Sequence, residues 1–314
     1  MAKQVCSRED LKMKMKQKKT KFKRTLDDRL MYGFTTVMLV LVIVLTGYPV
    51  LYVISSSFSS SAALNAGQVL LWPVEFTLDS YKFVMQYETV WTGFKNTLFM
   101  TLAGLVLKLT LTVLCAYPLS KRNYQGVKFM TTVFFITMMF SAGLVPYFLV
   151  RSQLGLVGTR WAVLSCGTLS ISNMLILRTA FKQVPLELYE AAELDGASDF
   201  QTLFHVGLPL SKATLSVLTL YGLVGGWNEY FNSLIYLRDK ALYPLQLVLR
   251  TILLGTQSLD LTNVTSSQMI QQASNGIEGI KYTLIVLSTV PILVLYMVIQ
   301  KSFKQGVMVG SLKG

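Results

Sequence analysis

The sequence predicts an all-α integral membrane protein with six transmembrane helices. Of its 314 residues, 52% are hydrophobic and only 14% are charged, whereas a soluble domain of this length carries about 25% charged residues. Six apolar runs are each about 20 residues long, which is enough for a helix to cross a bilayer. These runs occupy residues 30–54, 96–119, 129–150, 161–181, 214–237 and 282–299.

The N-terminal tail carries the densest charge in the chain. Residues 1–29 hold eleven of the 29 Lys and Arg residues. The formal net charge of +13 therefore indicates a cytoplasmic tail facing anionic lipid rather than a nucleic-acid-binding surface. The first predicted span, 30–54, is too long for the core of a signal peptide, so we expect an uncleaved anchor. The small residues from Ser59 to Ala63 are a weak alternative, as a cleavage site.

The remaining boundaries and the orientation follow from the spans and from the positions of Lys and Arg. We expect an extracytoplasmic loop over 55–93, a transmembrane domain over 94–300 and a cytoplasmic tail over 301–314. With both termini in the cytoplasm, 20 of the 29 Lys and Arg residues lie on the cytoplasmic side and eight on the other. This asymmetry follows the positive-inside rule. It also places the connection 185–209 in the cytoplasm.

Residues 185–209 form a charged, interrupted amphipathic segment in a chain of long apolar runs. Pro185 suits the first turn of a helix, and Gly196 permits the left-handed residue that commonly ends one. Ser198 and Gln201 have capping-box spacing, so a second short helix is expected to begin at once. Two short helices joined at Gly196 suit contact with a soluble partner. A linker that merely lies on the surface is the alternative.

The 185–209 segment also carries a spaced motif. It reads Glu190-Ala191-Ala192, three residues, Gly196, nine residues, Val206, one residue, Leu208-Pro209. This motif resembles the EAA motif of ABC-importer permease subunits, and Val206 in place of Ile is the one departure. The resemblance implies a type I ABC importer permease fold, with a cytoplasmic coupling helix that docks into a groove on a separate ATPase. The residues to which it gives this coupling role are Glu190, Ala191, Ala192, Asp195, Gly196, Leu208 and Pro209.

Nothing in the sequence favours an enzyme. The chain has no Gly-Lys dipeptide and therefore no standard phosphate-binding loop, so ATP and Mg²⁺ would be bound by a partner ATPase. His205 is the single histidine, which excludes a Ser/His/Asp set outside the 185–209 segment. Cys6, Cys115 and Cys166 suggest no disulfide framework, and no cluster has metal-ligand spacing. We expect no cofactor and no metal in this chain.

Lys108 lies near the middle of the predicted span 96–119. A charged side chain at that depth costs roughly 3 kcal/mol on insertion scales, and it usually faces a partner or a wet cavity. Glu229, in the span 214–237, lies at a similar depth and is the candidate partner. Two roles remain open for Lys108: a structural ion pair with Glu229 that joins the two spans, and a position on the solute path.

The span 214–237 contains the string Trp227-Asn228-Glu229-Tyr230, preceded by Gly222 and Gly225-Gly226, which permit close helix approach or a break. An indole ring beside amide and carboxylate groups suits a sugar, because pyranose faces stack on aromatic rings and sugar hydroxyls need hydrogen-bond partners. We therefore place Trp227, Asn228, Glu229, Tyr230 and Lys108 on the substrate path. A polar clasp between helices is the structural alternative for the same string.

The string Trp-Asn-Glu-Tyr resembles the one at this place in maltose-type, MalG-like carbohydrate permeases. The stretches 231–239, 243–246 and 141–161 look most like the LplC/YtcP branch, which is associated with complex or polymeric glycans. The resemblance implies an importer for carbohydrate, an oligosaccharide or complex glycan, in the plasma membrane of a prokaryote. The implied partners are a homologous second permease, two ATPase subunits and an extracellular solute-binding lipoprotein, and no nucleic acid.

Two other classes remain as alternatives at this point. An ion- or proton-coupled secondary transporter would use Lys108 and Glu229 as its coupling pair, and it would transport without a partner. A membrane scaffold without transport would tolerate changes at Asn228 or Glu229.

Overall fold

The computed structural model describes residues 26–86, 88–121, 125–140, 142–257 and 278–297. These residues are mainly helical and contain no strand, which confirms the all-α class. The chain separates into two compact units, Met1–Leu51 and Tyr52–Gly314. The predicted cytoplasmic tails lie outside the described residues, except for residues 26–29.

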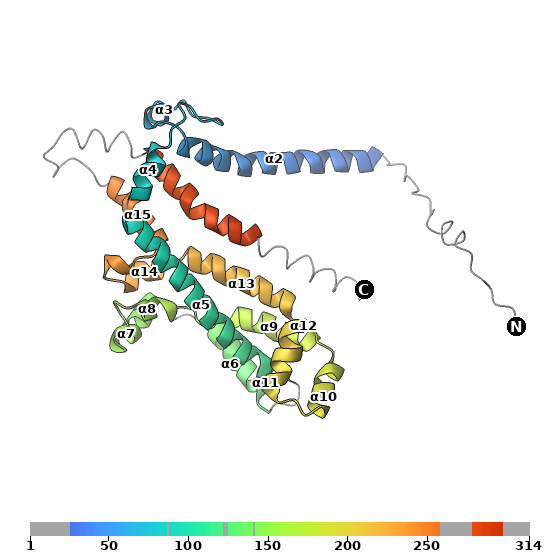
Figure 1. The fold of residues 1–314 in the computed structure, drawn as a ribbon. Helices are drawn as coiled ribbons and strands as arrows, with labels where there is room; N and C mark the ends of the chain where they lie inside the picture. Colours follow the sequence, from blue (N-terminus) through green and yellow to red (C-terminus); the bar gives the residue numbers. More distant parts are fainter. Residues whose placement is uncertain (1–25, 87, 122–124, 141, 258–277, 298–314) are drawn as a thin grey trace. The chain divides into compact units, whose positions relative to one another are not determined.

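The helices follow one another closely along the chain (Figure 1). Their bounds are α2 Leu26–Ser57, α3 Ser61–Asn65, α4 Asp79–Gln86, α5 Glu88–Ser120, α6 Val127–Met139, α7 Leu144–Gln153, α8 Arg160–Leu164, α9 Ile171–Gln183, α10 Leu186–Leu194, α11 Asp199–Thr202, α12 Leu208–Leu210, α13 Lys212–Trp227, α14 Phe231–Tyr236 and α15 Leu245–Gln257. A π-helical turn, Leu203–Gly207, joins α11 to α12, and a 3-10 turn, Lys240–Leu242, precedes α15. The final described helix is Glu278–Met297.

Three described helices are long and apolar enough to cross a membrane, namely Leu30–Ser57, Glu88–Ser120 and Glu278–Met297. Two bent pairs raise the number to five if each pair is one span: α6 with α7, bent by 112°, and Asp199–Leu210 with α13, bent by 82°. The count of six spans therefore stays a prediction.

Three of the predicted spans are wrong as continuous helices. The run 129–150 breaks between α6 and α7, where Gly143 has a φ of 80°, and the run 161–181 breaks between α8 and α9, where Gly167 has a φ of 61°. Both glycines adopt the left-handed backbone conformation that other residues rarely occupy. The run 214–237 breaks after Trp227 and resumes as α14.

Helix α5 is the element on which the second unit is assembled. It packs against α9, α13 and α15, and Figure 1 shows α9 and α13 alongside it. Its residues contribute to three separate buried clusters: Val90 to the first, Met100 to the second and Tyr117 to the third. A 33-residue helix is about 50 Å long, so α5 connects all three clusters as one continuous helix.

Two glycines let α13 approach α5 closely, as the sequence predicted. A Cβ atom at Gly226 would lie 3.1 to 3.3 Å from three atoms of Thr101, including its Cα, and a Cβ at Gly222 would lie 2.6 Å from Leu105 Cδ1. Gly225, by contrast, has open space around it. Gly222 and Gly226 are four residues apart and lie on one face of α13, so this small-residue pair sets the separation of the two helices.

Polar bonds attach the start of α15 to α5. The Leu245 amide N–H donates to Thr97 Oγ1 at 2.7 Å. The Asn96 amide donates to the carbonyl oxygens of Ala241 at 2.7 Å and Tyr243 at 3.2 Å, and its own oxygen accepts from Arg160 Nη2 at 2.9 Å. Asn96 and Thr97 are buried. Satisfied buried polar groups hold a fixed geometry, so α15 has a defined position on α5.

We expect Gly226→Val to destabilise the protein by about 1–3 kcal/mol, because the new side chain meets the backbone of Thr101 and cannot be accommodated by a rotamer change. The matched control is Gly225→Ala, which fills open space and gains helix propensity. Thermal unfolding in detergent measures both. Equal melting temperatures for the two variants would contradict the close contact.

Candidate functional site

The 185–209 segment folds as two short helices that meet at Gly196. Gly196 has a φ of 78°. The N–H groups of Gly196 and Ala197 donate to the carbonyl oxygens of Glu193 and Ala192, each at 3.0 Å, which is the hydrogen-bond pair of a Schellman motif. Ser198 and Gln201 form the capping box that opens α11. The helix end at Gly196 and the capping box at Ser198 are thus confirmed, whereas Pro185 lies at the N-cap of α10, one residue before its first turn.

Most of the segment's apolar side chains are exposed. No residue of α10 is buried, and Leu194 and Phe200 are 88% and 64% exposed. Glu190, Ala191 and Asp195 are also exposed. Exposed apolar side chains gathered among acidic ones mark a surface that binds another protein.

A cluster of aromatic side chains packs against the inner side of α10. Tyr189 is half-buried, and its hydroxyl donates to the carbonyl oxygen of Phe181, the end of α9, at 3.3 Å. The Tyr117 ring lies 5.7 Å from the Phe181 ring, edge to face, and 6.3 Å from the Tyr189 ring. Burial, and then the neighbouring Tyr117 hydroxyl, raise the pKa of Tyr189 to about 12. Tyr189 therefore stays neutral and acts as a packing group.

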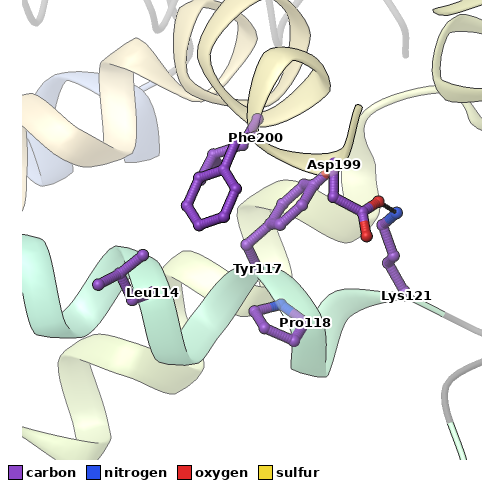
Figure 2. Close-up of a pocket in the computed structure, with 7 residues that line it drawn as sticks. Leu114, Tyr117, Pro118, Lys121, Asp199 and Phe200 are labelled. Atoms are coloured by element: carbon purple, nitrogen blue, oxygen red, sulfur yellow. Dashed lines mark hydrogen bonds and ion pairs between the residues drawn. The ribbon is translucent and has the colours of Figure 1, made fainter. Parts of the chain in front are cut away.

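Lys121, directly after α5, binds both short helices. Its ammonium pairs with Glu193 of α10 at 3.5 Å and with Asp199 of α11 (Figure 2). It also lies 5.4 Å from the centre of the Tyr117 ring. Burial lowers the pKa of Lys121, but the hydrogen bond to Asp199 and the nearby negative groups outweigh burial, so the pKa is raised. A cation with a raised pKa keeps its ion pairs until the pH rises through that pKa, so this clamp persists at neutral pH.

The other end of the segment is packed tightly. A Cβ atom at Gly207 would lie 3.6 Å from both the Tyr117 and Phe181 rings. Leu208 packs against the same cluster, while Pro209 is exposed. The buried π-helical turn therefore lies against the aromatic rings at Gly207, with room for ordinary van der Waals contact.

Three hollows surround the segment. A groove of about 990 Å³ runs along α10 and includes Leu186, Glu187 and Glu190 in its lining. A second, of about 310 Å³, is lined by residues including Ala192, Asp195 and Gly196. The third, of about 210 Å³, lies where Leu114, Tyr117 and Pro118 of α5 face Asp199 and Phe200 of α11 (Figure 2). Five of the seven predicted coupling residues thus lie in α10 or line the hollows beside it. Leu208 packs on the aromatic cluster, and Pro209 lies exposed in α12.

Lys108 and Glu229 line one small cavity of about 30 Å³, together with Cys166. No ion pair joins them among the described residues. Both oxygens of Glu229 accept hydrogen bonds from Asn232 instead, from its backbone N–H and its amide group, each at 2.8 Å. Glu229 therefore caps the start of α14, and the pairing with Lys108 stays a prediction.

The contacts of Trp227 match the structural alternative rather than a sugar-stacking role. Trp227 is 2% exposed, its indole N–H donates to the carbonyl oxygen of Ser288 at 2.9 Å, and its ring lies edge to face with Phe94 at 5.6 Å. A sugar ring cannot reach a face that is already covered. We correct the assignment of Trp227 accordingly. Asn228 is exposed and Tyr230 is 39% exposed, so both remain accessible.

Some residues of these sites were not singled out from the sequence. Lys121, Tyr117 and Phe181 hold the 185–209 segment, and Gln246 and Arg250 lie beside Asn228 and Tyr230. The position of Lys121 at the cytoplasmic end of a predicted span is the only signal that could have found it. Among the described residues, no group of three or more His, Cys, Asp and Glu side chains could hold a metal ion.

Comparisons of the sequence with known proteins agree on the family of this chain. Residues 20–309 match the family described as binding-protein-dependent transport system inner membrane component. Protein LplC of Bacillus subtilis (strain 168) is 37% identical over 86% of this chain and 90% of its own length. The polygalacturonan/rhamnogalacturonan transport system permease protein YtcP of the same strain is 33% identical over 93% of this chain and 100% of its own length.

Solved structures share the fold. A chain from the crystal structure of a bacterial ABC transporter involved in the import of the acidic polysaccharide alginate superposes with a TM-score of 0.81 at 33% identity, covering 89% of this chain and 98% of that chain. The chain therefore belongs to the family of binding-protein-dependent transport system inner membrane components, the membrane-spanning, non-enzymatic permease subunits of ABC importers.

Proposed function

We propose that this permease imports carbohydrate, as an oligosaccharide or a fragment of a complex glycan, and that the 185–209 segment is its coupling helix. The observation that carries the second part is the exposed helix pair around Gly196, which presents apolar and acidic side chains while Lys121 and the Tyr117 cluster hold its inner side. A surface-lying linker would need neither the clamp nor the packed glycine at 207.

The proposed mechanism uses the segment as a rigid lever. A separate ATPase binds ATP and Mg²⁺ and carries out hydrolysis, and its closure moves the docked α10 and α11. Because Lys121 pairs with a residue on each side of Gly196, the two helices move together. The displacement passes to α5, α9 and α13 through the cluster of Tyr117, Phe181 and Leu218 and changes the side of the membrane to which the solute path opens.

The carbohydrate proposal draws on the relatives that match over nearly their full length. The names of these relatives include polygalacturonan, rhamnogalacturonan, galactooligosaccharides and alginate. The accessible residues Asn228 and Tyr230 supply an amide and a phenol, which suit sugar hydroxyls. We place Asn228, Glu229, Tyr230 and Lys108 on or beside the solute path.

We also propose the assembly and its orientation. The importer would contain this chain, a homologous second permease, two ATPase subunits and an extracellular solute-binding lipoprotein, in the plasma membrane of a prokaryote. The positive-inside distribution of Lys and Arg supports placing both termini and the 185–209 segment in the cytoplasm. A second related structure holds an alginate pentasaccharide-bound periplasmic protein, with a TM-score of 0.60 at 18% identity, which indicates a shared fold.

We expect Glu190→Lys and Gly196→Val each to lower solute-stimulated ATP hydrolysis at least about tenfold in the reconstituted importer. Glu190→Lys reverses a charge at the proposed docking face. Gly196→Val strains a backbone conformation that glycine adopts without cost. Gly196→Asn should retain more activity, because Asn tolerates the left-handed conformation. The control is Glu88→Lys, which makes the same charge change at the start of α5, the end of that helix far from Lys121 and the 185–209 segment. Loss of activity in the control alone would contradict the assignment.

We expect Lys121→Glu and Asp199→Lys each to uncouple ATP hydrolysis from uptake, and the double variant to recover a substantial part of the coupling, because it restores the ion pair with its charges exchanged. The measurement is sugar imported per ATP hydrolysed in proteoliposomes. The proposed clamp is wrong if the double variant is as defective as the two single changes combined.

The secondary-transporter alternative predicts a different dependence on partners. In proteoliposomes that hold this chain and its partner permease without ATPase subunits, we expect no uptake under an imposed proton or sodium gradient. Adding the ATPase, internal ATP and loaded binding protein should start uptake. Gradient-driven uptake that is lost in both Lys108→Met and Glu229→Gln would support the alternative instead.

A further inference from the structure

Helix α15 carries two polar side chains on an otherwise buried stretch. Leu245, Leu247, Val248 and Leu249 are 1–9% exposed. Gln246 and Arg250 are half-buried, and they lie four residues apart on one face of the helix. This face meets the break between α13 and α14, where Gln246 Nε2 lies 3.5 Å from Asn228 Oδ1.

The guanidinium of Arg250 is positioned but not neutralised by a described residue. It lies over the Tyr230 ring, with its central carbon 5.0 Å from the ring centre. No described carboxylate forms an ion pair with it, and the neighbouring Glu229 directs both its oxygens to Asn232. A guanidinium held by a ring in this way does not spend its N–H donors on the ring, so they stay available to another acceptor.

This arrangement has the chemistry of a site for an acidic sugar. A guanidinium fork matches a carboxylate in a bidentate geometry, which a neutral sugar cannot satisfy. The Asn228 and Gln246 amides beside it can bind ring hydroxyls. The hydrogen bonds from the Leu245 N–H to Thr97 and from the Asn96 amide to the Tyr243 carbonyl oxygen fix the start of α15 against α5, so the cation is held on a positioned helix.

We propose that Arg250, oriented by Tyr230, binds the carboxylate of a uronic acid residue in the imported oligosaccharide, and that Asn228 and Gln246 bind its hydroxyls. This inference rests on the proposed function and narrows its substrate to acidic glycans. It assigns direct solute contacts to this permease subunit. Arg250 acts as the specificity-determining residue, and Tyr230 acts as its positioning residue.

The test compares two sugars that differ only at the carboxyl group: an oligogalacturonate and the same oligomer with its carboxyl groups methyl-esterified. The full importer is reconstituted in proteoliposomes, and each sugar is supplied at a concentration that saturates the binding protein, measured separately. For Arg250→Gln we expect the uptake ratio of acid to ester to fall about tenfold, since a hydrogen bond to a charged group is lost. Arg250→Lys should recover part of the ratio, because it restores the charge without the fork.

The matched control is Arg238→Gln, which removes the same charge from an exposed arginine and should leave the ratio unchanged. Equal losses for acid and ester in Arg250→Gln would show a structural role and overturn the inference. Wild-type importer that takes up only the ester would also overturn it, while leaving the proposed carbohydrate function intact. Wild-type importer that takes up neither these sugars nor neutral oligosaccharides under ATP would contradict the proposed function itself.

Discussion

The attachment of the 185–209 segment to the end of α5 is the constraint on which the proposed coupling depends. A segment that presents its apolar side chains to a partner cannot also bury them to stabilise itself, so its position must come from the opposite side. The Lys121 ion pairs and the Tyr117, Phe181 and Tyr189 rings supply that support. Because the partners come from α5, α9 and both short helices, the proposed motion of the segment would pass to the helices behind it.

Helix α5 connects this end of the unit to the region around α15. Tyr117 lies near one end of α5, and Asn96 and Thr97, which hold α15, lie near the other. Between them, Thr101 and Leu105 meet Gly226 and Gly222 of α13. Close contacts at backbone distance resist sliding, since a packed interface transmits strain rather than absorbing it. The α13–α14 break, with Asn228 and Tyr230, therefore sits on the same framework of packed helices as the 185–209 segment.

Breaks in the apolar runs create the chemistry of the proposed solute path. A continuous helix would bond all its backbone groups internally and leave little for a solute. The break after Trp227 instead places Glu229 as a cap on α14 and brings Asn228 and Tyr230 beside Gln246 and Arg250. Irregular backbone at membrane depth is tolerated where protein or a wet cavity covers it. Such breaks are a common source of binding sites in transporters.

The sequence alone was sufficient for the all-α membrane class, the motif around Glu190, the left-handed Gly196 and the capping box at Ser198, because each depends on composition or on residues a few positions apart. The tertiary structure decided the rest. Lys121 meets Asp199 across 78 residues, and the Trp227 indole donates to the carbonyl oxygen of Ser288 across 61. The sequence around a residue does not indicate which distant residue it will contact in the folded chain. An exposed tryptophan and a buried one look alike along the chain, and only packing separates them.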